Sequence, residues 1–108
     1  MESEVLKKMH RRIVKSFMDV LILAELRNVP MSGYDVIGFV HNKFGILVSS
    51  GTVYSLLYSL ERKNLIKGVW AKRKRVYELT EKGERIIETI LNANDKIKAL
   101  ITNLLLTY

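Results

Sequence analysis

The sequence predicts a mainly α-helical domain that contains one small β-hairpin. Three observations support this. Apolar residues recur at helical spacings of three and four over most of the chain. Residues 65–79 instead alternate and are rich in β-branched and aromatic side chains. The length of 108 residues is that of one domain, which buries enough surface to fold without a metal or a disulfide, and the absence of cysteine excludes thiol chemistry.

An amphipathic helix is expected over residues 3–27. Pro30 closes this segment, because its ring disfavours a helical conformation in the preceding residue. One face of the expected helix carries a strip of cations, which either extends a contact with an anionic partner or forms an ordinary solvated face. These cations are Lys7, Lys8, Arg11, Arg12 and Lys15.

Two shorter helices are expected next. Ser32-Gly33-Tyr34-Asp35 fits a capping box at the start of the first, and Gly45 suits its end because glycine adopts positive φ readily. Ser49 or Ser50 then caps a helix that runs to about Lys63. The face opposite its apolar stripe is small, polar and aromatic and carries no acid.

The hairpin expected over residues 65–79 has a basic tip. The chain has 18 Lys and Arg against 11 Asp and Glu, a net charge of +7, and residues 62–75 alone hold seven cations and no acid. Such a charge favours nucleic acid, an acidic membrane surface or an acidic protein as partner. The turn contains neither Gly nor Asn, so its type is left open. Trp70 is expected to be buried between the hairpin and a helix.

A helix capped by Thr80 is expected to complete the chain. Its apolar residues follow steps of four and three, the heptad spacing of a two-helix interface. The rest of so small a domain does not easily cover this stripe, so we expect residues 84–108 to form a dimerisation helix within the same compact unit. The predicted interface residues are Ile86, Ile90, Ala93, Ile97, Leu100 and Leu104.

Helix, helix, helix, basic hairpin, helix is the order of a winged helix-turn-helix, here with a long N-terminal helix and a C-terminal dimerisation helix. One helix of this fold enters the major groove of duplex DNA, and the hairpin binds phosphates or the minor groove. We assign these roles to residues 50–63 and 72–75, and residues 1–83 become the DNA-binding domain. The candidate contacts are Ser50, Thr52, Ser55, Tyr58, Ser59, Arg62, Lys72, Arg73, Lys74 and Arg75.

Four stretches within about residues 20–90 resemble the PadR family of transcriptional regulators: Ser32-Gly33-Tyr34-Asp35, Ser50-Gly51-Thr52-Val53-Tyr54, residues 60–66 and residues 76–83. The resemblance implies a homodimeric winged-helix DNA-binding regulator, a repressor or a related regulator. It also implies that Tyr34 and Tyr54 lie near phosphates. Ser55 departs from the family, whose members usually have proline there. The tryptophans that bind aromatic effectors in some relatives are missing, and whether a small molecule tunes binding is left open.

Two other functions fit the same features. An architectural protein that coats DNA with low specificity would suit the charge and the plain Ser and Thr face. A protein-interaction module would use the winged-helix surface and the terminal helix to hold a partner.

An enzyme is not expected, because the sequence shows no nucleophile–base set and no phosphate-binding loop. Neither a cofactor nor a metal is expected, since His10 and His41 match no ligand pattern. No membrane-spanning or secretory segment is visible, and a cytoplasmic location is expected.

Overall fold

The computed structural model describes residues 3–107. Residues 1–2 of the predicted DNA-binding domain (1–83) and residue 108 of the predicted dimerisation helix (84–108) lie outside the described range. Six helices and one antiparallel hairpin follow the expected order, which confirms the mainly helical winged-helix fold. The elements are α1 (Glu4–Ser16), α2 (Met18–Leu26), α3 (Gly33–Phe44), α4 (Ser50–Arg62), β1 (Ile66–Ala71), β2 (Lys74–Leu79), α5 (Glu81–Asn92) and α6 (Asn94–Leu106).

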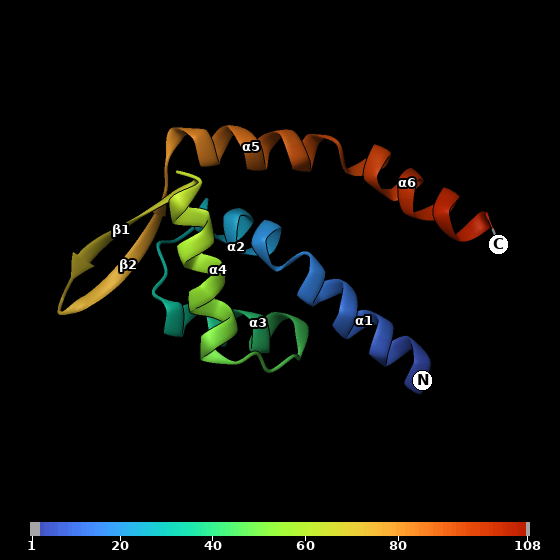
Figure 1. The fold of residues 1–108 in the computed structure, drawn as a ribbon, viewed down its shortest axis with the longest axis horizontal. Coiled ribbons are helices and arrows are strands. Elements are labelled where there is room, and N and C mark those ends of the chain that lie inside the picture. Colours follow the sequence, from blue (N-terminus) through green and yellow to red (C-terminus); the bar gives the residue numbers. More distant parts are fainter. Residues whose placement is uncertain (1–2, 108) are drawn as a thin grey trace.

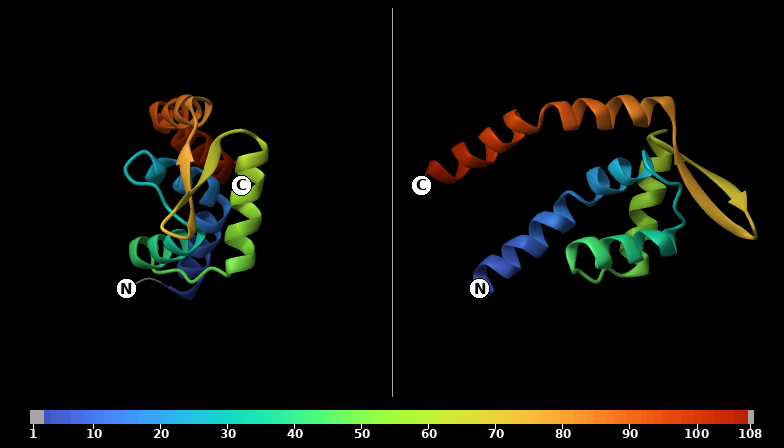
Figure 2. Two further views of the ribbon diagram at one scale, coloured as in Figure 1. Left: turned by 90° about the vertical axis from the view of Figure 1, so that its left-hand side faces the viewer. Right: turned by 180° about the vertical axis from the view of Figure 1, so that it is seen from behind.

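The molecule consists of a body and three projections (Figure 1). The body comprises α2, α3, α4, α5 and the base of the hairpin. Its core brings together fully buried side chains from each of these elements, among them Ile22, Val36, Leu57, Tyr77 and Ile87. Burying one such side chain contributes about 1.5–3 kcal/mol. The projections are α1 and α6, here called the arms, and the tip of the hairpin, which points away from the arms (Figure 2).

Local capping sets the starts of three helices, as the sequence predicts. Ser32 and Asp35 form the complete capping box of α3, and Gly45 ends that helix at a φ of 70°. Ser49 accepts a hydrogen bond from the Thr52 amide at the start of α4. Thr80 does the same for α5.

Two helices that were expected to be continuous are each broken by one residue. Phe17 separates α1 from α2, and Ala93 separates α5 from α6; both have φ near −100° and ψ of 14°. At each break the chain leaves the body: α2 and α5 pack on the core, whereas α1 contributes only Val14 to it and α6 buries no residue. The prediction of unbroken helices was wrong. Each break changes the backbone angles of one residue only, and the spacing of apolar residues continues across it, so the sequence pattern does not reveal the break.

The hairpin turn consists of Lys72 and Arg73, with φ of 49° and 69°. Two consecutive residues at positive φ are the requirement of a type I′ turn, which matches the twist of the flanking strands. Non-glycine residues adopt this conformation at a cost of roughly 1–2 kcal/mol each. Met31 adds one antiparallel bridge to the sheet through reciprocal backbone hydrogen bonds with Tyr77.

Trp70 does not fill the space between hairpin and helix, so that prediction was wrong. It is 73% exposed, whereas Tyr77 is 1% exposed and takes the buried position. The register explains the exchange: Gly68 pairs with Tyr77 over the core, and Trp70 pairs with Arg75 two residues closer to the tip. Both aromatic rings lie on one face of the hairpin, but the body ends before it reaches Trp70.

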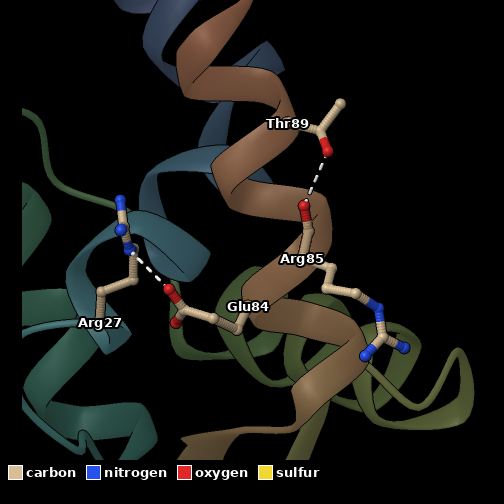
Figure 3. A network of polar contacts seen from close by, with 4 residues as sticks. All are labelled: Arg27, Glu84, Arg85 and Thr89. Atoms are coloured by element: carbon tan, nitrogen blue, oxygen red, sulfur yellow. Dashed lines mark hydrogen bonds and ion pairs between the residues drawn. The ribbon is translucent and has the colours of Figure 1, made fainter.

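A salt bridge holds α5 against α2 (Figure 3). Arg27 Nε donates to Glu84 Oε1 at 3.1 Å. One turn further along α5, the Thr89 hydroxyl donates to the carbonyl of Arg85. No helix in the described part of the chain is long and apolar enough to cross a membrane.

Candidate nucleic-acid interface

The outward face of α4 is the surface that the sequence assigns to the major groove. Val53, Leu57 and Leu60 point into the core, and this orientation fixes the opposite face towards solvent. Most of the predicted contacts are brought together on that outward face. Ser50, Thr52, Tyr54, Ser55, Tyr58 and Arg62 are exposed, and Ser59 is half-buried.

One side of α4, here called the hydroxyl flank, borders a groove of about 900 Å³. Thr52, Ser55 and Ser59 line it from α4. Arg11 and Lys15 line it from α1, so two cations of the N-terminal strip lie beside the predicted reading face. The sequence left open whether this strip extends a contact or is a solvated face, and gave no sign of which cations lie beside α4.

The other side of α4, here called the aromatic flank, carries Tyr54 and Tyr58, whose ring centroids lie 6.3 Å apart. Tyr54 packs across the start of α3, where a Cβ on Gly33 would overlap its ring. Tyr34 follows directly and is 80% exposed. The structure therefore places both tyrosines that the family resemblance singled out at the N-terminus of α3.

The role of Gly33 was missed by the sequence analysis. Glycine is an unfavourable residue inside a helix, so its position directly after a serine cap was the available signal of a close approach. The adjacent Asp35 is held by the backbone N–H and hydroxyl of Ser32, and Lys74 lies 3.6 Å away. The hydrogen bond from the Ser32 backbone, more than any other contact, lowers the pKa of the Asp35 carboxyl.

The four predicted cations of the wing divide into two pairs. Lys74 forms the ion pair with Asp35 of α3, and Arg75 Nη2 lies 2.6 Å from Glu61 Oε2 of α4. These two contacts connect the hairpin to both helices. Lys72 and Arg73, in contrast, occupy the turn and form no ion pair within residues 3–107.

Arg75 is bound on three sides. Its hydrogen bond to Glu61 raises the pKa of the guanidinium, which also lies over the ring of Tyr77 at 5.7 Å. It covers Gly68, where a Cβ would overlap the guanidinium. The Glu61 carboxylate accepts a second hydrogen bond from the Gly68 amide. The sequence does not distinguish the four wing cations, because the acidic partners of Lys74 and Arg75 lie 39 and 14 residues away along the chain.

The predicted interface residues fall into two groups. Ile86 and Ile90 pack against the core of their own body, and Ala93 is the break between α5 and α6. Beyond it, Leu100 and Leu104 are 64% and 65% exposed. The first turns of the segment that we expected to be a dimerisation helix are therefore part of the body.

The arm α1 has a second exposed apolar stripe. It includes Val5, Leu6, Met9 and Ile13. Both arms thus present large apolar side chains that the described chain leaves uncovered. No group of three or more His, Cys, Asp or Glu side chains within residues 3–107 is placed to hold a metal ion.

The four-helix body, the basic hairpin beside it and the solvent-facing side of α4 define a winged-helix protein of the transcription-regulator class. A model of the transcriptional regulator PadR-like family matches residues 22–89. The chain therefore belongs to the PadR-like family of transcriptional regulators, as its motifs predict.

Solved structures agree with this assignment. The chain is similar to a putative transcriptional regulator from Thermoplasma acidophilum, with 25% identity over 90% of this chain and 96% of that one and a TM-score of 0.69. A PadR family transcription regulator from Clostridium difficile is 26% identical over 82% of this chain and 98% of that one, with a TM-score of 0.73. Bacillus subtilis PadR in complex with operator DNA shares the fold. Its identity is 23% over 68% of this chain and 46% of that one, and the TM-score is 0.60. No match to a curated protein was found.

Proposed function

We propose that this protein is a homodimeric repressor that binds duplex DNA sequence-specifically, with α4 in the major groove and the hairpin turn on phosphates or in the minor groove. The observation that supports this most directly is the position of cations on both sides of α4. Arg11 and Lys15 lie at its hydroxyl flank, and Lys72 and Arg73 lie in the hairpin turn. A duplex seated on α4 would present phosphates to both sets. A relative of the same fold is known in complex with operator DNA.

The proposed contacts follow from exposure and charge. Serine and threonine hydroxyls on α4 would meet base edges, and Tyr58 would meet a base or its sugar. Arg62, Lys72 and Arg73 would bind phosphates, as would the hydroxyls of Tyr34 and Tyr54 near the start of α3. The base-edge set is Ser50, Thr52, Ser55 and Ser59. Lys74 and Arg75 remain in the interface, with their ion pairs orienting the hairpin.

The proposed dimer buries the exposed stripes of the arms against a second copy. A two-fold axis between the arms would place the α4 helices of the two copies about 34 Å apart. This is one turn of DNA, so each helix would bind one half-site. Apolar arms are suited to this because their large side chains have no partner in the described chain. A dimer seated on a promoter would exclude RNA polymerase, the simplest route to repression.

Footprinting of the purified protein on its own promoter tests this proposal. We expect a discrete protected site with two-fold symmetry, at a protein concentration well below that needed to bind random duplex at about 150 mM salt. The charge-reversed double variant Lys72→Glu, Arg73→Glu is expected to lose the footprint. Equal affinity of the wild type for promoter and random duplex would contradict sequence-specific regulation.

Architectural binding is the second candidate function, and one observation favours it. The centre of the α4 face offers Ser and Thr hydroxyls, without the Asn, Gln or Arg side chains that make bidentate contacts to bases. A protein that coats DNA would protect long stretches uniformly. Chromatin pull-down with sequencing separates the two functions, since a regulator gives a few sharp peaks.

A further inference from the structure

Trp70 is the only tryptophan in the chain, and its indole is mostly exposed to water. It lies on β1 directly opposite Arg75, one pair before the Ala71–Lys74 pair that flanks the turn. Exposing so large an apolar ring costs free energy that a contact with a partner would recover. The position is therefore better suited to a contact than to a structural role.

Within residues 3–107, the indole of Trp70 has no aromatic, cation–π or hydrogen-bond partner. Arg75, its cross-strand neighbour, is directed to Glu61 and to the ring of Tyr77. The aromatic pairs and the cation–π contact of residues 3–107 do not include Trp70. The exposed part of the indole is therefore available to a partner.

The charges around Trp70 indicate the chemistry of its partner. Lys72 and Arg73 follow it in the turn, and residues 62–75 contain no acid. A partner of Trp70 must therefore present anionic groups beside an apolar surface. The minor groove of DNA does so, because its walls are deoxyribose carbons bordered by phosphates, and minor-groove proteins combine cations with apolar side chains there.

We propose that Trp70 is a DNA-binding residue whose indole enters the minor groove and packs on deoxyribose and base edges, while Lys72 and Arg73 bind the phosphates on either side. The proposal rests on the DNA-binding function proposed above and adds an apolar contact to it. The hairpin projects beyond the helices (Figure 2), and the exposure of Trp70 leaves its indole accessible to such a groove. The ion pairs of Lys74 and Arg75, the two residues of β2 nearest the turn, hold this end of the hairpin to α3 and α4.

The single tryptophan makes the test direct. Fluorescence of the full chain is followed while a duplex containing the footprinted site is added, and anisotropy of labelled DNA is recorded in parallel. We expect the indole emission to shift or be quenched with the same midpoint as the anisotropy, and to become protected from acrylamide. We expect Trp70→Ala to weaken binding about tenfold and Trp70→Phe to retain most of the affinity.

Salt dependence separates the apolar contact from its charged neighbours. Trp70→Ala removes no charge, so the slope of log affinity against log salt is expected to stay at its wild-type value. Lys72→Ala is the matched variant, and it is expected to lower that slope by about 0.9. Circular dichroism confirms that both variants fold.

Three results would overturn the proposal. The first is wild-type protein that binds DNA with unchanged indole emission, and the second is Trp70→Ala with wild-type affinity. The third is a blue-shifted indole emission in the absence of DNA that disappears when the protein is diluted. Such a shift would show that Trp70 is buried in a contact between copies of the protein. The proposed regulatory function fails separately, by absence of a footprint, because groove contact by Trp70 is measurable on any duplex.

Discussion

The body and the projections of this protein differ in what they do with large apolar side chains: the body buries them, and the projections leave most of them exposed. In the body, each helix turns an apolar stripe inward, and side chains such as Ile22, Leu57 and Ile87 lose contact with water completely. In the arms, side chains of the same type remain in water: α1 buries only Val14, and α6 buries none over Asn94–Leu106. The hairpin repeats the contrast in one element, with Tyr77 buried at its base and Trp70 exposed near its tip.

This contrast indicates which parts of the protein bind partners. The body accounts for its own stability, because its apolar residues contact one another. The projections expose apolar surface that only a partner removes from water, and large exposed apolar patches mark interaction sites. We therefore expect substitutions in the body to alter the free energy of unfolding, and substitutions in the projections to alter binding.

The largest effect is expected in the arm α6. Leu100→Asp and Ile97→Asp each place a charge in the proposed dimer interface, where it has no partner, and we expect the dimer dissociation constant to rise about a hundredfold or more. Sedimentation velocity measures the change. Thr102→Asp, on the opposite side of α6, is the matched control. An unchanged dimer in the Leu100 variant would show that this arm lies outside the interface.

The next effect is expected where α5 begins on the body. A Cβ on Gly83 would overlap the backbone carbonyl of Leu65, which accepts a hydrogen bond from the Thr80 amide and has little room to move. We expect Gly83→Ala to lower the free energy of unfolding by about 1–3 kcal/mol in urea. Gly38→Ala is the control, since nothing lies near its Cβ, and it is expected to stabilise α3 by about 1 kcal/mol.

A smaller effect is expected at the cap of α3. Ser32→Ala removes the side-chain half of the capping box and should cost about 1 kcal/mol. Because the pKa of Asp35 is lowered in the folded state, its contribution to stability is present above the unfolded pKa and is lost as pH falls through the folded pKa. NMR titration of Asp35 should give a higher pKa in the variant. An unchanged pKa would show that the serine hydroxyl has no effect on the carboxyl.

Sequence predicted those features that depend on neighbours along the chain. Ser32 and Asp35 are three residues apart, and Thr80 caps the amide of Gly83 at the same spacing, so both helix starts follow from local chemistry. The burial of Trp70 was mispredicted, because it depends on where the body ends beneath the hairpin. No local pattern reports this, since Trp70 and Tyr77 share one face and differ only in distance from the tip.

The wing cations show the same limit at the site itself. Lys72, Arg73, Lys74 and Arg75 form one run in the sequence, and their equal charge predicts equal roles. Folding assigns Arg75 to Glu61 and Lys74 to Asp35, and leaves the turn residues in the projection. Such a division depends on packing between segments far apart in the chain.

The smallest effect, a few-fold change in DNA affinity, tests this division. If Arg75 positions the hairpin, Arg75→Gln and Glu61→Gln should weaken binding to a similar extent, because either change removes the same ion pair. If Arg75 binds a phosphate instead, Glu61→Gln should strengthen binding by releasing the guanidinium. The salt slope provides a second readout: Arg75→Gln should keep the wild-type slope, whereas Lys72→Ala should lower it by about 0.9. A slope lowered equally by both variants would place Arg75 on the DNA with the turn residues.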